Sequence, residues 1–440
     1  MTSTSGRVRA GQFNQALRQL AYIFIALALP RLGVSRELIG QWEALLFIGY
    51  LLGFGWTTGL LQSFLVKVGQ LTATETDWFS RRAVAVMAGI SAVILLTVAL
   101  LHTPFFALLQ LERGPVGWPL FFLLLLSRWP AYCFEQALLL GGHVRTLVVY
   151  AILNAGGLAA ALLLPLYFGA SFPEAMGVLG GAAGGKFLLI LGWSLRRPRP
   201  GGDAAAAVPA PPTPPIRDWL RLGQPLVAYA TVGALVTAVD PWLVNYWFAG
   251  DAEVFAVFRY GVRELPLLSA LIAGMTVVTI PAITRQRAAG LTELKDQSRK
   301  LYHLVFGLAL LLSLTADYWW TLVFTKAFAE SIPVFRTFLL VVGCRLVFAM
   351  SVLTALTQTR RLYLWGLLEL LVNVAASLLL APHYGLLGIV WGTVIATYFH
   401  ECCLILYLRY RTGIPWRAYA DLRWYFGYLT LLFLSYWAIH

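Results

Sequence analysis

The sequence predicts an all-α integral membrane protein, a polytopic bundle of 12–13 transmembrane helices in two parallel six-helix lobes around a central cavity. The chain of 440 residues is 59% hydrophobic and only 12% charged, whereas about 25% of the residues in a soluble domain are charged. Apolar runs of about 20 residues, the length that crosses a bilayer, recur along the whole chain. A proline- and alanine-rich stretch, residues 196–217, separates them into two sets and is predicted to be a disordered cytoplasmic linker.

The predicted spans follow one another with short loops between them. The first lobe, residues 1–195, contains six spans: Gln12–Gly33, Ile39–Lys67, Arg81–His102, Gly117–Gly141, Thr146–Phe168 and Glu174–Leu195. The second lobe, residues 218–411, contains another six: Trp219–Phe248, Ala252–Thr284, Leu301–Thr325, Ile332–Thr357, Leu362–His383 and Leu386–Arg409. Residues 412–440 form an extra C-terminal helix, whose short aromatic run Trp424–Ile439 either crosses the membrane or lies as a hairpin or interfacial helix.

Lysine and arginine gather in alternate loops, as the positive-inside rule requires. The basic side includes Arg81 and Arg82, the segment Arg285 to Lys300, and Arg360 with Arg361. We expect this side to be cytoplasmic, with the N-terminus on the same side. The net charge of +13 therefore follows from membrane topology and does not indicate nucleic-acid binding, which requires a basic soluble domain.

Two segments six spans apart resemble each other. Residues 159–169 close span five with Ala-Ala-Ala-Leu-Leu-Leu-Pro, and residues 375–385 close span eleven with Ala-Ala-Ser-Leu-Leu-Leu-Ala-Pro. The following spans both open with glycine pairs, Gly177 and Gly181 in one and Gly388 and Gly392 in the other. An even number of spans in each half preserves orientation, so the halves are predicted to be parallel repeats with the substrate between them.

The clearest candidate site lies in span eight, where Arg259 and Arg263 are four residues apart and share one face of a predicted continuous helix. Charges inside a span face a cavity or a partner because burial in lipid is costly, and two arginines could bind an anion through their planar forks. Alternatively, Glu264 or Asp240 neutralises one arginine as a structural pair. Asp240 is also a candidate cation or proton site for coupling. Pro266 is predicted to kink the helix.

Further charges lie inside other predicted spans. Arg128 and Glu135 share a face of span four, either as part of a site or paired across helices. Lys186 in span six and Arg345 in span ten are further candidates for substrate binding, and Glu135 joins Asp240 and Glu264 as a candidate coupling or counter-ion residue. Glu369 and Glu401 make the predicted interior more polar.

No cofactor is predicted. The four cysteines lack the spacing of metal ligands, and the six histidines are scattered. The run Gly180 to Lys186 resembles the start of a phosphate-binding loop, but Phe187 replaces the required Ser or Thr and no strand precedes it, so no nucleotide is expected. Gly177, Gly181 and Gly185 are expected to form a ridge of small residues for close helix packing.

The opening of the chain is similar to that of a known family. Leu29-Pro30-Arg31-Leu32-Gly33 followed by Ile39-Gly40-Gln41-Trp42-Glu43, and the later Val239-Asp240-Pro241-Trp242, resemble Wzx-type polysaccharide and O-antigen flippases of the multidrug/oligosaccharidyl-lipid/polysaccharide exporter superfamily. The resemblance implies a two-lobed bundle in the bacterial inner membrane. It also implies movement of an undecaprenyl-diphosphate-linked oligosaccharide across it. A thirteenth span departs from the family's usual 12 or 14, and span one carries few of the charges typical of the lipid II flippase branch.

The sequence thus favours a transporter, not an enzyme. The leading hypothesis is a flippase for a lipid-linked anionic oligosaccharide, acting by alternating access, with membrane lipids and polysaccharide-assembly proteins as its expected partners. One alternative is a cation-coupled small-molecule exporter of the multidrug type. Another is a membrane glycosyltransferase or an O-antigen polymerase or ligase, although the short loops leave no room for a large outer catalytic domain.

Overall fold

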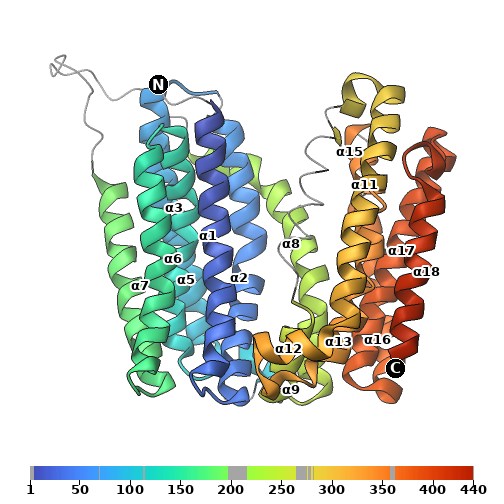
Figure 1. Cartoon of the computed structure of the whole chain (residues 1–440). Coiled ribbons are helices and arrows are strands. Elements are labelled where there is room, and N and C mark those ends of the chain that lie inside the picture. The colour runs from blue at the N-terminus through green and yellow to red at the C-terminus, as the bar shows by residue number, and fades with distance from the viewer. Residues whose placement is uncertain are drawn as a thin grey trace. The chain divides into compact units, whose positions relative to one another are not determined.

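The computed structural model describes residues 4–68, 70–111, 114–196, 216–263, 275, 279–280, 282–356 and 362–439, and these residues form helices and loops with no strand among them. The contacts divide the chain into two compact units, Met1–Ala234 and Leu235–His440 (Figure 1). The predicted all-α fold class is confirmed. The predicted linker lies mostly outside the described residues.

The first unit is built from long helices that run side by side (Figure 1). Its helix α3 begins with a capping box, in which the Thr72 hydroxyl accepts from the Glu75 amide and the Glu75 carboxylate accepts from the Thr72 amide. Ser171 and Glu174 form the same motif at the start of α7, which satisfies amides that have no partner within the helix. The helices are α1 Thr4–Arg31, α2 Arg36–Val68, α3 Ala73–Leu100, α4 His102–Leu108, α5 Trp118–Leu140, α6 Val144–Tyr167, α7 Phe172–Leu195 and the start of α8, Ile216–Trp247.

An aromatic core joins the start of α8 to α2 and α3. Phe64 stacks on Phe79 with ring centroids 5.6 Å apart, and Trp219 meets both rings edge-on. The Trp219 indole N–H donates to the Leu60 carbonyl at 3.1 Å, so its polar end is satisfied although the residue is fully buried. The chain that follows the predicted linker therefore packs first within unit 1, and the unit extends to Ala234.

Glycines explain some helix contacts in this unit but not the ones predicted. A side chain at Gly180 would press against Leu120 of α5, which indicates close packing of α5 and α7. A Cβ at Gly177, Gly181 or Gly185 would meet no atom within 4 Å. The predicted ridge of these three residues is therefore wrong within the described structure, because that face of α7 has no neighbouring helix against it.

The second unit contains more breaks than the first. Short helices α9 and α12 lie at the same end of the unit, with α12 crossing the end of α11 (Figure 1). The bend between α11 and α12 measures 80°. The elements after α8 are α9 Ala252–Gly261, α11 Arg287–Leu314, α12 Ala316–Phe324, η1 Lys326–Phe328, α13 Ser331–Leu339, α14 Val342–Arg345, α15 Ala349–Ala355, α16 Leu362–Tyr384, α17 Leu386–Thr412, η2 Trp416–Ala418 and α18 Leu422–Ile439.

Arg336 holds the bend at the end of α11. Its side chain is 5% exposed, and its Nε donates to the Ser313 carbonyl at 3.1 Å. Its Nη2 donates to the Asp317 carboxylate at 2.7 Å. One guanidinium thus donates to a carbonyl in the last turn of α11 and pairs with the first turn of α12, which fixes the angle between the two helices.

Predicted span ten is not one helix but three short ones, α13 to α15. Tyrosine hydroxyls from three other helices donate to backbone carbonyls at the breaks, and two of these carbonyls, those of Leu340 and Gly343, also accept the amide three residues further on. Tyr398 of α17 reaches Leu340, Tyr425 of α18 reaches Gly343 and Tyr302 of α11 reaches Leu346, at 3.0, 3.1 and 3.4 Å. Irregular backbone inside a membrane is tolerated only when the protein itself satisfies its polar groups, and these bonds provide that here.

The C-terminal helix α18 is one uninterrupted helix of 18 residues, so the hairpin alternative is excluded. Besides Tyr425, it provides Tyr436, whose hydroxyl lies 3.1 Å from the Thr337 hydroxyl and accepts from the Trp391 indole at 3.3 Å. The helix therefore ties α13 to α17 at a second point.

Eight helical segments of the described chain, with Ser331–Ala355 counted as one, are long and apolar enough to cross a membrane, and a ninth span results if α11 and α12 count as one. This establishes a multi-pass membrane protein, although the number is smaller than the 12–13 predicted. Helices α1, α5 and α18 are outside this set. Each carries charged, amide, tryptophan or tyrosine side chains that lower its hydropathy.

Replacing Arg336 with Met tests the role assigned to it at the bend. The variant removes one donor from the Ser313 carbonyl and the cation that pairs with Asp317, so we expect a loss of about 2 kcal/mol of unfolding free energy. The measurement is thermal unfolding of the purified protein in detergent. Arg299→Met, an exposed position on the same α11, is the matched control and should leave Tm unchanged. Equal Tm values for both variants would contradict the assignment.

Candidate functional site

Helix α9 ends at Gly261, two residues before Arg263. A Cβ at Gly261 would clash with Val334 of α13, so glycine allows the two helices to touch at this point. The Val262 amide still bonds to the Phe258 carbonyl at 2.9 Å, and the Arg263 amide bonds to the Tyr260 carbonyl at 3.3 Å in a turn. The Arg263 guanidinium then lies 5.0 Å from the centre of the Tyr260 ring, which is itself buried and stacked on Phe328.

The predicted continuous helix through span eight is therefore wrong where the structure describes it. Arg259 lies in the last turn of α9, where a cation is favourable to the helix dipole, whereas Arg263 lies beyond the helix end. Arg259 and Arg263 therefore do not share the face of one helix, contrary to what their spacing of four residues predicts. Both are half-buried and both interact with other residues. Glu264 and Pro266 lie outside the described residues, so the predicted structural pair and kink are untested.

Glu135 is the acidic centre of a polar cluster inside unit 1. It is 5% exposed, and one carboxylate oxygen accepts both from the Asn14 amide at 2.7 Å and from Arg18 at 3.2 Å. The partners come from α1, while Glu135 belongs to α5. The cross-helix pairing predicted as the alternative for Glu135 is thus observed, and its partner is Arg18.

Arg128, predicted together with Glu135, is held by aromatic residues. Its Nε donates to the Tyr132 hydroxyl at 2.6 Å and its Nη1 to the Tyr22 hydroxyl at 2.9 Å. The guanidinium carbon also lies 4.9 Å from the centre of the Tyr22 ring. Among the described residues these bonds use two of the five guanidinium N–H donors. The guanidinium is half-buried, and the two tyrosine hydroxyls fix the direction in which its remaining N–H donors point.

Lys186 of α7 completes the cluster. Its ammonium group donates to the Asn154 side-chain oxygen of α6 at 3.1 Å, and it interacts electrostatically with Glu135, Arg128 and Arg18. We call Arg18, Arg128, Glu135 and Lys186 the basic cluster. Three cations and one carboxylate leave it with a net charge of +2 when all four are ionised, in the interior of apolar helices.

Sequence reasoning found three of these four residues and missed Arg18. It also missed Asn14, Tyr22 and Tyr132, which position the charges. A signal was present, since Asn14, Arg18 and Tyr22 are spaced four residues apart and therefore line one face of α1.

Asp240 is the centre of a second group, inside unit 2. Its two carboxylate oxygens accept from the Asn373 amide at 2.7 Å and from the Thr393 hydroxyl at 2.5 Å. The Ser377 hydroxyl, which has one proton to donate, lies 3.0 Å from the Asn373 side-chain oxygen and 3.3 Å from the Ile389 carbonyl oxygen. We call Asp240, Asn373, Ser377 and Thr393 the Asp240 group. Within the described chain the carboxylate is held by an amide and a hydroxyl, not by an arginine.

Glycine brings the two helices of this group together. A Cβ at Gly392 would clash with Ser377, and one at Gly388 would press on the Leu380 carbonyl. These are the glycines of the predicted repeat, and in α17 they allow close approach to α16. Asn373 and Ser377 are 4% and 1% exposed, so the oxygen atoms they contribute are removed from solvent.

Other intramembrane charges of unit 2 lie along the same helices. Glu369 of α16 is 3.6 Å from the His400 ring nitrogen of α17, one turn before Asn373. One carboxylate oxygen of Glu401 is buried and has no hydrogen-bond partner among the described residues. Arg345 ends the short helix α14 inside the broken span, is half-buried and interacts with other residues. No His, Cys, Asp and Glu cluster of metal-site geometry occurs in the described part.

The fold matches solved structures of transporters, although no protein-family model and no curated protein sequence matches the chain. The lipid II flippase MurJ in an inward closed conformation has a TM-score of 0.67 at 15% identity, covering 98% of this chain and 93% of that one. An inward-facing multidrug resistance MATE transporter of the MOP superfamily has a TM-score of 0.63 at 14% identity, with coverages of 91% and 94%.

A third match is a MOP superfamily transporter from Pyrococcus furiosus, described as having a binding pocket of reverse polarity. Its TM-score is 0.59 at 14% identity, and the match covers 93% of this chain and 95% of that one. The chain therefore has the fold of MOP superfamily transporters, as its resemblance to their polysaccharide branch implied.

A double-mutant cycle between Arg18 and Glu135 tests the core of the basic cluster. Arg18→Gln alone leaves the buried Glu135 carboxylate without its cation and with Asn14 as its neighbour. We therefore expect Arg18→Gln to lower the unfolding free energy more in the original protein than in the Glu135→Gln variant. Because Arg18 is 25% exposed, the coupling should be about 1 kcal/mol. Thermal unfolding of the four proteins measures it. Effects that add to within about 0.3 kcal/mol would show that the pair contributes nothing.

Proposed function

We propose that the protein is a flippase that moves a lipid-linked anionic oligosaccharide across a bacterial inner membrane, with its N-terminus in the cytoplasm. The observation that carries the proposal is the basic cluster of unit 1. Buried cations inside membrane helices are costly and mark a substrate path or a paired structure. Here one carboxylate offsets only one of three cations, so the excess positive charge suits an anionic ligand.

The chemistry of the cluster favours a diphosphate. Arg128 is oriented by Tyr22 and Tyr132 and keeps several N–H donors for a ligand, and a guanidinium binds phosphate oxygens through two parallel hydrogen bonds. Lys186 adds a second cation whose present bond is to a neutral amide. A polyprenyl-diphosphate head provides two phosphates to meet these two cations, while its lipid tail stays in the bilayer.

The structural comparisons support the same class. The matched structure with a TM-score of 0.67 is described as a lipid II flippase, and the multidrug transporters share the fold at a TM-score of 0.63. The likeness concerns the fold, whereas the choice of a lipid-linked substrate rests on the basic cluster. The sugar-assembling proteins that make and consume such a substrate are the expected partners.

The Asp240 group supplies a candidate coupling site. Carboxylate, amide, hydroxyl and carbonyl oxygens lie together in a buried, hydrogen-bonded set, and hard cations prefer oxygen ligands. We propose that binding of a proton or alkali cation at Asp240 shifts the balance between inward-open and outward-open states. In this cycle the basic cluster takes the diphosphate head, the two lobes rock, and the head is released on the other side. Arg259, Arg263 and Arg345 remain predicted contacts along that path.

The second candidate is a cation-coupled exporter of small molecules. The Asp240 group favours it, because coupling to a cation gradient is what such a transporter requires. The two proposals differ in the charge of the substrate. An exporter of cationic compounds has no use for the excess positive charge of the basic cluster.

Replacing Arg128 with Gln should weaken binding of the proposed substrate. Undecaprenyl diphosphate carrying one sugar is the probe, and its binding to the purified protein is measured by native mass spectrometry. Loss of a charge-assisted bidentate contact should raise Kd by about tenfold or more. Arg145→Gln, which removes an exposed arginine at the start of α6, is the control. An unchanged Kd for the Arg128 variant would remove the basis of the proposal.

Replacing Asp240 with Asn should uncouple transport from the driving ion. The amide keeps the size of the side chain but cannot carry the negative charge. An imposed sodium or proton gradient should therefore no longer accelerate movement of the lipid-linked substrate across the membrane of proteoliposomes. Asp296→Asn, at an exposed position on α11, serves as the control and should respond like the original protein. A full gradient response in the Asp240 variant would show that coupling occurs elsewhere.

A further inference from the structure

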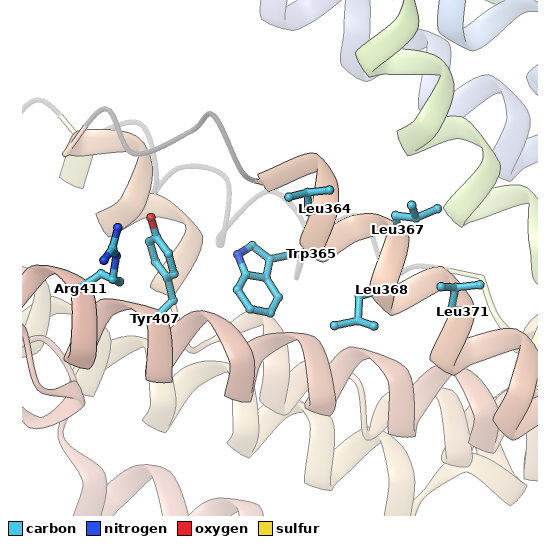
Figure 2. A pocket seen from close by; sticks show the side chains of 7 residues that line it. All are labelled: Leu364, Trp365, Leu367, Leu368, Leu371, Tyr407 and Arg411. Atoms are coloured by element: carbon cyan, nitrogen blue, oxygen red, sulfur yellow. The ribbon is translucent and has the colours of Figure 1, made fainter.

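A groove of about 680 Å³ lies between the beginning of α16 and the end of α17. Figure 2 shows its lining, with Tyr407 and Arg411 from α17 facing a row of residues from α16. It is separate from the basic cluster, which belongs to unit 1, and from the Asp240 group, which lies further along the two helices. The α16 residues that line it are Leu364, Trp365, Leu367, Leu368 and Leu371.

The groove has one polar end and one apolar end. Arg411, Tyr407 and Trp365 lie together at one end of the row, and Leu371 lies at the other (Figure 2). The rings of Trp365 and Tyr407 are 6.2 Å apart and nearly perpendicular. Among the described residues that line the groove, Arg411 is the only charged one.

This polarity follows the direction of the membrane. Arg411 is in the last turn of α17, so it lies where that span leaves the bilayer. Leu371 is nine positions after the start of α16 at Leu362, which places it roughly 13 Å further along the helix axis. Tryptophan and tyrosine prefer the membrane interface, and leucine prefers the hydrocarbon region. A membrane lipid has the same order, with its head at the surface and its chain inside.

The charge selects the kind of lipid. A single arginine with one neighbouring hydroxyl matches a single negative charge, such as the phosphodiester of phosphatidylglycerol. A diphosphate carries more charge and is better matched by two or more cations, as in the basic cluster. The leucines present apolar surface at the groove, with Leu364 and Leu367 each 46% exposed and Leu371 58% exposed. An acyl chain along them would cover this apolar surface.

We propose that the groove is a binding site for an anionic phospholipid with one net negative charge, whose phosphate meets Arg411 and Tyr407 and whose acyl chain lies along the leucines of α16. The lipid is distinct from the transported substrate. The proposal of this lipid site therefore does not depend on the flippase proposal.

The test is photo-crosslinking of the full chain, purified and reconstituted, with phosphatidylglycerol that carries a photoactivatable acyl chain. Phosphatidylcholine with the same chain is the comparison. Peptide mapping should place the phosphatidylglycerol label on residues 364–371, with roughly fivefold less label there from phosphatidylcholine. Equal labelling of this segment by the two lipids would overturn the proposal.

Two variants and two competitors sharpen the result. Arg411→Gln should reduce phosphatidylglycerol labelling of this segment roughly fivefold. Arg409→Gln removes an equal charge from the same helix turn, where the side chain lies against Tyr410 and outside the groove, and should leave labelling unchanged. Equal losses in both variants would overturn the proposal. Millimolar inorganic phosphate and equimolar undecaprenyl diphosphate should not displace the label, and displacement by either would assign the groove to free phosphate or to substrate instead.

Discussion

Polar groups inside apolar helices must find partners within the protein, and this constraint organises both units. Lipid offers no hydrogen bonds, so each unpaired backbone or charged group there costs several kcal/mol. The broken span of α13 to α15 shows the backbone case, because tyrosines from α11, α17 and α18 donate to carbonyls at its breaks. Arg336 performs the same task for the end of α11.

The same constraint separates structural charges from candidate binding charges. Glu135 and Arg18 pair across helices, and Asn14 helps to satisfy the carboxylate. Arg128 and Lys186 instead bond to neutral groups, tyrosine hydroxyls and an asparagine oxygen. We propose that these oriented cations bind an anion. In unit 2 the carboxylate of Asp240 is likewise held by neutral donors, and we propose that it binds a cation.

The sequence predicted the fold class and most span positions because apolar length is a strong signal. It did not predict the breaks after Gly261 and within 331–355, because hydropathy reports the polarity of side chains and not the position at which the backbone leaves the helix. Arg259 and Arg263 were placed on one face for that reason, although Arg263 lies beyond the end of α9. Arg128, Glu135, Lys186 and Asp240 were found as charges in apolar runs. Their partners on other helices, such as Tyr22 and Asn373, depend on tertiary contacts that spacing alone does not give.

The central claim is that the transported molecule is a lipid-linked anion. Its most direct test is a flipping measurement in proteoliposomes that hold the purified protein and a fluorescent polyprenyl-diphosphate glycolipid, with a cationic drug tested separately. We predict that the protein accelerates exposure of the glycolipid head on the opposite leaflet and leaves the drug untransported. Accumulation of the drug with no movement of the glycolipid would contradict the account and favour the multidrug-type exporter.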